Sequence, residues 1–236
     1  MFKKIIEFFL SIRTTIWVLW ILTFILFAGA FIMPVRAEFE SIHSIPLFKW
    51  LIKQPLAVVW WLWGAIGLLI LLTLNTIFCS IESIIKKRKT TQWLILISPQ
   101  IIHIGFLFIL LAHLFSSAGG FKGSAIAFEG TSFRMPDNTI LSVQKIDLNI
   151  DQRGFLRSWA VDIEYKSDDM VLKQDRILPN KPSIREGAGV YVKDLQAYPY
   201  KAILLEISRE PGAIWALIGG IIFGIGTIIL LALKMR

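Results

Sequence analysis

The sequence predicts an α+β membrane protein: four transmembrane helices, with one extracytoplasmic antiparallel β-sandwich or barrel-like domain between the third and the fourth. Three observations support this fold class. The 236 residues are 55% hydrophobic and only 18% charged, which is too apolar for an ordinary soluble domain. Four apolar runs are long enough to cross a bilayer core of roughly 30 Å. Between the last two runs, apolar and polar residues alternate with the period of a β-strand.

The predicted segments follow one another along the whole chain. Residues 1–13 form an amphipathic basic segment on the cytoplasmic side, which either lies along the membrane surface or simply begins the first span. The first span is expected to stay in the protein, because no small-residue cleavage site follows it. The remaining segments are spans at 14–33, 56–79 and 93–116, an extracytoplasmic loop at 34–55, a basic cytoplasmic loop at 80–92, the β domain at 117–210, and a last span with a cytoplasmic tail at 211–236.

The distribution of charge predicts the orientation in the membrane. The two termini and the Lys86–Lys89 cluster carry nine basic residues against two acidic ones, the first loop three against two, and residues 117–211 thirteen against thirteen. Basic residues concentrate on cytoplasmic flanks, so both termini are expected in the cytoplasm and the β domain outside, in a multi-pass protein of the inner (cytoplasmic) membrane. The basic balance therefore predicts contact with membrane lipid and no binding of nucleic acid.

The usual catalytic motifs are absent from the sequence. It holds no nucleophile elbow, no Walker loop, no zinc-protease motif and no C-x-x-C pair. Its one cysteine, Cys79, lies at the cytoplasmic end of the second predicted span, so the exported domain holds no disulfide. Hydrolase and transferase functions therefore have no support.

Two of the three histidines lie in the third span, where an ionisable residue is a candidate functional site by default. His103 and His113 are ten residues apart, so on one helix they are separated by about 15 Å and about 80°. They cannot both ligate one iron, because each axial imidazole must come within about 2 Å of it from opposite faces. We expect His103 to ligate haem iron with a second ligand from another subunit. His113 is a second candidate cofactor-binding residue, and His43, in a polar loop, is expected to be solvated.

Several other residues leave alternatives open. Pro99 either kinks the third span or begins a new helix after Ser98. Gly105 permits the close approach of a flat ring or of another helix. Trp60–Gly64, WWLWG, is read as an aromatic belt rather than a haem-facing surface. Small residues spaced by four predict a docking face for another helix on the last span: Gly212, Ala216, Gly220 and Gly224.

The region after the third span predicts five or six short strands separated by turns rich in proline, glycine, asparagine and aspartate. Such a number of strands suits a small antiparallel domain with a core of its own. The alternating segments are 124–130, 141–150, 158–167, 188–198 and 201–210.

Six short patterns occur in the order typical of one family. The first span opens with Ser11–Thr15, similar to S-x-R-x-T, and the second ends with Leu74–Ser80, similar to L-N-x-x-x-C-[ST]. Four more patterns follow: H-x-G at His103–Gly105; G-F-x-G and E-G at Gly120–Gly123 and Glu129–Gly130; N-x-P…G…Y at Pro179–Pro182 with Gly187 and Tyr191; and E-P-G at Arg209–Gly212. On these motifs and the four-span topology, the chain resembles the ResB (CcsB) family of system II cytochrome c biogenesis proteins.

The resemblance implies a function for the chain. Such proteins pair with a tryptophan-rich membrane protein of the ResC/CcsA type, carry haem b transiently across the membrane, and present it to apocytochrome c for covalent attachment. The intramembrane haem histidine of the family falls on His103, whereas His113 has no counterpart in the pattern. The chain would thus be a non-catalytic or co-catalytic subunit of a holocytochrome c synthase. Its exported domain is shorter than in many members of the family.

Two other functions fit the same residues. One is a haem b subunit that transfers electrons in a quinol oxidoreductase, although a second intramembrane ligand in the chain is then required. The other is a structural membrane anchor in which the histidines only form hydrogen bonds.

Overall fold

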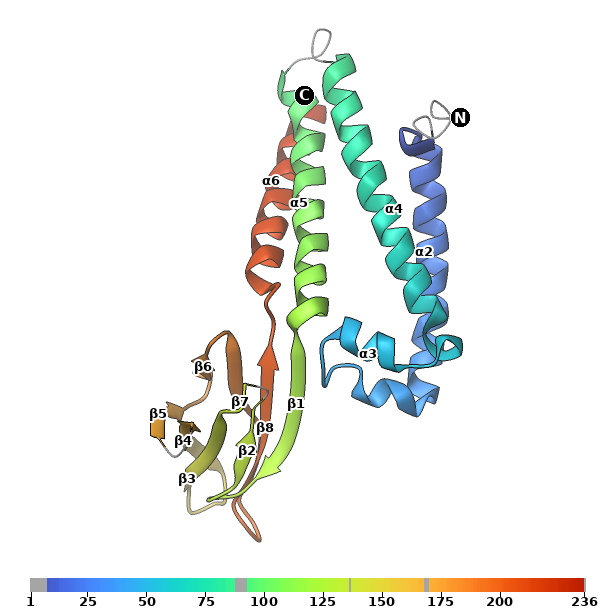
Figure 1. The fold of residues 1–236 in the computed structure, drawn as a ribbon. Coiled ribbons are helices and arrows are strands. Elements are labelled where there is room, and N and C mark those ends of the chain that lie inside the picture. The colour runs from blue at the N-terminus through green and yellow to red at the C-terminus, as the bar shows by residue number, and fades with distance from the viewer. Residues whose placement is uncertain (1–7, 88–92, 136, 168–169, 236) are drawn as a thin grey trace. The chain divides into compact units, whose positions relative to one another are not determined.

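The computed structural model describes residues 8–87, 93–135, 137–167 and 170–235. It divides into two compact units, which are described separately below (Figure 1). One unit comprises Met1–Gly120 and Pro211–Arg236 and is helical, and the other comprises Phe121–Glu210 and consists of strands.

Four helices of the first unit are long and apolar enough to cross a membrane, which makes the chain a multi-pass membrane protein. They are α2 (Ile12–Ile32), α4 (Leu56–Lys87), α5 (Trp93–Gly119) and α6 (Ala213–Lys234). They alternate in direction, so the start of α2, the end of α4, the start of α5 and the end of α6 lie at one end of the unit (Figure 1).

Helix α4 extends through Lys87 into the predicted cytoplasmic loop. Its last turns are stabilised by an ion pair between Glu82 and Lys86, four residues apart on the helix surface. The rest of that predicted loop, 88–92, and residues 1–7 of the predicted amphipathic segment lie outside the described residues.

The segment predicted as a loop at 34–55 is largely folded. It holds two short 3-10 helices, Met33–Val35 and Ala37–Ser41, and the helix α3, Leu47–Lys53. Trp50 is 1% exposed; its ring lies 5.2 Å from that of Phe39, and its Nε1 donates to Ser41 Oγ at 3.1 Å. Buried aromatic pairs of this kind stabilise a fold by more than the area they bury, so they hold the segment in one conformation.

The tryptophans of the second span divide between two roles. Trp60 and Trp63 are exposed, as expected of an aromatic belt, but Trp61 is 3% exposed and packs 6.0 Å from the ring of Phe39. Its ring also fills the space beside Gly29 of α2, where a Cβ would overlap it. Trp61 is therefore a core residue that joins α2, α4 and the folded loop, and the belt interpretation fails for it.

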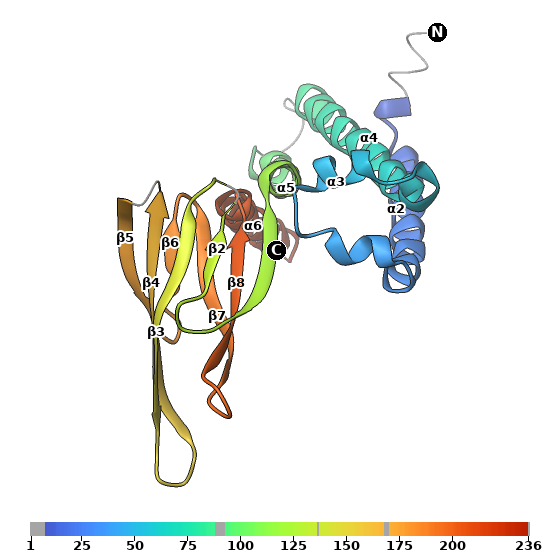
Figure 2. The ribbon, with the colours of Figure 1, turned by 60° about the horizontal axis from the view of Figure 1, so that its bottom comes forward.

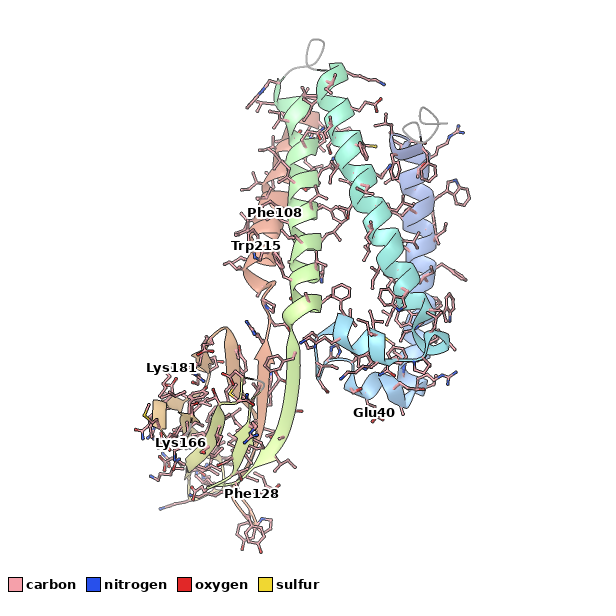
Figure 3. All side chains as sticks on the ribbon, viewed as in Figure 1. Glu40, Phe108, Phe128, Lys166, Lys181 and Trp215 are labelled. Carbon is pink, nitrogen blue, oxygen red and sulfur yellow. The ribbon has the colours of Figure 1, made fainter. Side chains whose placement is uncertain are left out.

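Helices α5 and α6 pack through glycines. A Cβ on Gly219 would lie 2.8 Å from the carbonyl oxygen of Gly105, and one on Gly105 would overlap the backbone of Phe223. Gly226 approaches Ile102 of α5 equally closely, and Phe108 of α5 packs on Trp215 of α6 with ring centroids 5.8 Å apart (Figure 3). The face that contacts α5 thus carries Gly212, Gly219 and Gly226, whereas Gly220 and Gly224 of the predicted docking face meet nothing within 4 Å.

Pro99 lies inside α5, which is continuous from Trp93 to Gly119. The interpretation that a new helix begins at Pro99 is therefore wrong. Transmembrane helices tolerate such a proline where neighbouring groups compensate for the lost hydrogen bond.

The second unit holds eight strands in two antiparallel sheets of four (Figure 2). One sheet has the order β1-β8-β7-β6 and the other β2-β3-β4-β5. Both sheets contribute to one hydrophobic core, so the unit is a β-sandwich. The strands are β1 (Phe121–Ala127), β2 (Ser132–Arg134), β3 (Ile140–Ile150), β4 (Leu156–Ser167), β5 (Met170–Ile177), β6 (Ser183–Arg185), β7 (Ala188–Gln196) and β8 (Ala202–Arg209).

The sequence missed three of these strands. β2 and β6 have three residues each, which is too short for a period to emerge. β5 is an edge strand with four consecutive polar residues, Lys173–Arg176, before its last residue. Edge strands often carry such charges, which also oppose pairing with other chains.

A buried tyrosine links the two sheets through a chain of hydrogen bonds. The hydroxyl of Tyr165, a fully buried side chain of β4, lies 2.9 Å from Ser183 Oγ of β6, which donates to Asp175 Oδ2 of β5 at 2.7 Å. The hydrogen bond from the Lys173 ammonium, 2.8 Å away, lowers the pKa of Asp175; the Ser183 hydroxyl adds to this, and burial opposes it. The ionised carboxylate is therefore the form that completes the chain.

The contact between α5 and α6 predicts a difference between adjacent glycines. Gly219→Leu should separate the two helices, because the new side chain would meet the backbone of α5. Gly220→Leu is the matched control, since a Cβ there meets nothing within 4 Å. We expect faster hydrogen exchange of α5 and α6 amides and a lower Tm in detergent for Gly219→Leu alone. Equal effects of both substitutions would contradict the packing.

Asp175→Asn should loosen the sandwich in a pH-dependent way. The folded pKa of Asp175 is lower than its ordinary value of about 4, so its stabilising effect is complete above that value and is lost as the pH falls through the folded pKa. Hydrogen exchange of β4 and β5 amides in the full chain should be faster in the variant at pH 7, and the difference should close on acidification. Asp194→Asn, at an exposed position of β7, is the control. A constant difference at every pH would exclude the carboxylate as the cause.

Candidate functional site

His103 lies on α5, about 15 Å along the helix from Trp93, at a depth within the span rather than at its edge. The side chain is half-buried. Its Nδ1 lies 2.7 Å from Oγ of Ser80, on the neighbouring helix α4. A polar pair between two spans satisfies groups that lipid would leave unpaired, so the pair also joins α4 to α5.

This contact bears on the tautomer of the imidazole. Ser80 Oγ either accepts a hydrogen bond from Nδ1–H or donates a hydrogen bond to an unprotonated Nδ1. In the first arrangement Nε2 carries no proton, and its lone pair is free to ligate a metal. Metal-ligating histidines almost always donate their other ring nitrogen in this manner, which fixes both the tautomer and the ring orientation.

The packing of α6 against α5 determines the direction in which the His103 side of α5 faces. Gly105 is two residues from His103, about 200° around the helix, and it lies against Gly219 and Phe223 of α6. The absence of a side chain at Gly105 therefore serves the approach of a helix and not that of a flat ring. Since α6 occupies that side, His103 faces away from α6 and toward α4.

A buried polar group lies one turn before His103. Gln100 is 7% exposed, and its Oε1 has no hydrogen-bond partner within the described part of the chain. Ser98 Oγ, on the same helix, is also buried without a partner there. Residues three apart on a helix are neighbours, so Gln100 adds an unused acceptor beside His103. Unpartnered buried polar atoms call for an explanation, and a bound polar group is one.

A second polar contact fixes α4 on its other side. Asn75 is 1% exposed; its Nδ2 donates to the carbonyl of Phe9 at 2.7 Å, and its Oδ1 accepts from Thr15 Oγ1 at 2.5 Å. Cys79 Sγ lies 3.5 Å from the same carbonyl. The pattern Leu74–Ser80 thus holds both the residues that fix α4 to the start of α2 and the serine that meets His103.

The structure does not bring the three histidines together. His113 is exposed on α5, ten residues beyond His103, and His43 is exposed in the folded loop after Ser41. Sequence reasoning selected His103 but missed Ser80 as its partner. The sequence did carry a signal for this pair. Consecutive spans run antiparallel, so a hydroxyl near the end of one span can lie beside an imidazole near the start of the next.

The site suits a haem better than a free metal ion. Within the described residues, no group of three histidine, cysteine, aspartate or glutamate side chains converges to hold an ion. A haem supplies its own four equatorial nitrogens and needs only axial ligands from protein. One imidazole with a fixed tautomer fits that need, with a second axial ligand drawn from elsewhere.

Fold and site together define a multi-pass membrane protein with a β-sandwich and an intramembrane imidazole. No family model matches the sequence, and no curated protein matches it. Among solved structures, the chain is similar to one described as "Cytochrome c Heme Lyase CcmF", with a TM-score of 0.43 and 13% identity over 94% of this chain and 35% of that chain. The chain thus spans about a third of the length of that structure. A likeness at this level defines neither the family nor the function.

Proposed function

We propose that the chain is the ResB-like subunit of a system II cytochrome c synthase. In this proposal, His103 ligates haem b inside the membrane while the haem is in transit. A ResC/CcsA-type protein supplies the second ligand, and the β-sandwich orients haem or apocytochrome c on the extracytoplasmic side. The chain then lies in the cytoplasmic membrane with both termini inside, and it acts as a non-catalytic or co-catalytic subunit.

The observation that carries the proposal is the 2.7 Å contact between Ser80 Oγ and His103 Nδ1. It supports a ligand because it orients the ring, and the tautomer with the proton on Nδ1 directs an unprotonated Nε2 away from Ser80. The six family-like patterns support the same function: Asn75 and Cys79 of the second pattern anchor α4, and Ser80 contacts the histidine of the third. His113 stays a predicted ligand, for which the described residues supply no hydrogen-bond partner.

In such a site, the residues of this chain would ligate the iron, orient the ligand and close one face of α5. Haem, when bound, supplies the iron that the imidazole ligates and the porphyrin that is later attached to apocytochrome. Ser80 holds the His103 ring and its proton at Nδ1. Gln100 offers a buried acceptor one turn away, and the packing of α6 on Gly105 keeps the opposite face of α5 closed.

A structural anchor is the second candidate, and the same hydrogen bond favours it. If Ser80 donates to Nδ1, the ring proton is on Nε2, which then has no free lone pair for iron, and the pair only links two helices. The two functions differ in what the loss of the imidazole does. In the anchor, helix packing weakens and haem is unaffected; in the synthase subunit, haem binding is lost.

The test replaces His103 by Gly in the complex purified with its membrane partner. We expect lower haem content and an altered absorption spectrum, both restored by added imidazole, which can enter the space that the side chain leaves. Ser80→Ala should weaken haem binding by roughly ten- to a hundredfold, as loss of the partner of a metal-ligating histidine does.

Ile104→Gly is the matched control, because it places the same flexible residue at an adjacent exposed position of α5. A haem content and spectrum in His103→Gly equal to those of Ile104→Gly would remove the ligand claim and leave the anchor.

A further inference from the structure

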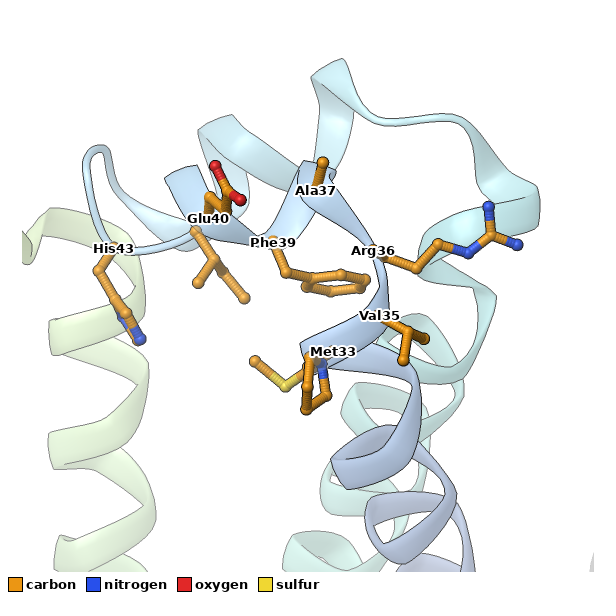
Figure 4. A pocket seen from close by; sticks show the side chains of 9 residues that line it. Met33, Val35, Arg36, Ala37, Phe39, Glu40 and His43 are labelled. Carbon is orange, nitrogen blue, oxygen red and sulfur yellow. The ribbon is translucent and has the colours of Figure 1, made fainter.

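Two surface features outside the His103 region differ in how well they suit a partner. The depression lined by residues 33–43 is open and encloses little surface, and the Arg36 side chain extends away from it (Figure 4). Small-molecule sites usually bury most of their ligand, so this depression does not suit one. The free edge of β1 in the sandwich instead offers a row of backbone hydrogen-bonding groups (Figure 2).

Three of the four edge strands of the sandwich are protected against pairing. β2 and β6 have only three residues each, and β5 carries the polar run Lys173–Arg176. Short strands and charges are common ways in which proteins keep an edge from pairing with another chain. β1 has neither protection: it has seven residues, and its one charge, Lys122, is paired with Glu206 of β8 at 2.8 Å.

The edge of β1 is also regular. Its seven residues pair with β8 without a register shift, whereas the pairings of β3 with β4, β4 with β5 and β7 with β8 each contain at least one. A bulge would twist an edge away from a partner. In an antiparallel ladder every second residue of an edge strand directs its N–H and C=O groups outward. Within the described part of the chain, no backbone hydrogen bond reaches β1 from that outer side.

Gly123, inside β1, has no contact or dihedral angle that requires a glycine. Four other glycines of the family-like patterns do have one. Gly130 and Gly187 have positive φ angles, and a Cβ on Gly105 or Gly212 would overlap a neighbouring backbone. A Cβ on Gly123 would meet nothing within 4 Å, and its φ is not positive. A glycine inside a strand weakens it and often marks the close approach of another backbone, so Gly123 indicates a strand that comes from outside the chain.

Apolar side chains lie at the end of the same edge. Ile126 of β1 is 64% exposed, and Phe128, directly after the strand, is 48% exposed (Figure 3). They are two residues apart, which in extended backbone places them on one face. A strand paired with β1 would cover them with alternate side chains of its own. Strand addition takes its affinity from main-chain hydrogen bonds and its specificity from such side-chain contacts.

The chemistry of this edge selects an unfolded polypeptide. A row of outward N–H and C=O groups is complementary to another extended backbone, whereas a folded partner has already paired most of its own backbone groups. The proposed function brings one unfolded chain to the sandwich. Apocytochrome c lacks its haem, and a cofactor that binds only the folded state stabilises that state, so its absence favours the unfolded chain.

We propose that β1 binds an extended segment of apocytochrome c as an added strand of the sheet β1-β8-β7-β6. The inference rests on the proposed function and deepens it, because it assigns the apocytochrome to one edge of the sandwich. The pairing keeps the bound segment extended until haem is attached. The attached haem then favours the folded cytochrome c, which withdraws the segment from β1.

The test measures amide hydrogen exchange of the purified full chain in detergent, with either apocytochrome c or folded holocytochrome c added. We expect apocytochrome c to slow exchange at every second amide of β1, because only those N–H groups point outward. The amides of the other edge strands, β2, β5 and β6, should keep their rates. Holocytochrome c should leave all of these rates unchanged, because it offers no free extended backbone.

Gly123→Lys is the variant that should block the edge. A Cβ there meets nothing within 4 Å, so the chain should fold, but the charged side chain would stand where the added strand packs. Ile184→Lys is the matched control, since it places the same charge at an exposed position of β6, the opposite edge of the same sheet. Gly123→Lys should lose the protection by apocytochrome c, and Ile184→Lys should keep it. If Gly123→Lys does not fold, the comparison of apocytochrome c with holocytochrome c on the wild-type chain decides.

Equal exchange of the β1 amides with and without apocytochrome c would overturn the inference. Protection that appears without apocytochrome c and rises with the concentration of the chain would also overturn it, because β1 would then pair with a second copy. The haem content of His103→Gly separates these outcomes from a failure of the proposed function. Haem loss in that variant with β1 unprotected removes the edge site alone, whereas retained haem with β1 protected removes the membrane ligand alone.

Discussion

The arrangement of the helical unit depends on the contact between Ser80 and His103, which joins α4 to α5. A polar side chain inside an apolar span is costly without a partner, and here the partner comes from a different helix. The same helix α4 is bound on its other side through Asn75, which reaches α2 and the backbone before it. Helix α4 therefore has polar contacts to α2 on one side and to α5 on the other.

The packing of α6 complements this arrangement. Gly105, Gly219 and Gly226 let α5 and α6 approach at backbone distance, and this contact fixes the rotation of α5. Once that rotation is set, His103 lies on the side of α5 that faces α4. A bulky residue at any of these glycines would separate the helices and move the imidazole, although none of them touches it.

The large features of the fold could be predicted from the sequence, since they depend on periodicity alone. Four apolar runs became four helices, and five alternating segments became strands of the sandwich. Features set by contacts between distant residues could not be predicted. The sequence places Trp61 in an aromatic belt, because its contacts with Phe39 and Gly29 are not visible in the sequence. The sequence predicts a loop at α3, because the residues that bury Trp50 lie outside that helix.

Of the two residues in the candidate site, the sequence predicted His103 but not Ser80. The cost of an ionisable group in lipid identified His103, but the choice of its partner required the register of α4 against α5, which no single helix encodes. The glycines of α6 illustrate the same limit. Spacing by four suggested one face, whereas the packed face carries glycines spaced by seven, because two antiparallel helices that remain in contact repeat about every two turns.

The central claim is that an imidazole of this chain ligates haem within the membrane. Pulsed electron paramagnetic resonance of the ferric complex tests it directly, with histidine labelled by a heavy nitrogen isotope in this chain only. A hyperfine coupling between the iron and a labelled nitrogen, abolished by His103→Gly, is the expected result. A spectrum with couplings from the porphyrin and the unlabelled partner alone would contradict the claim.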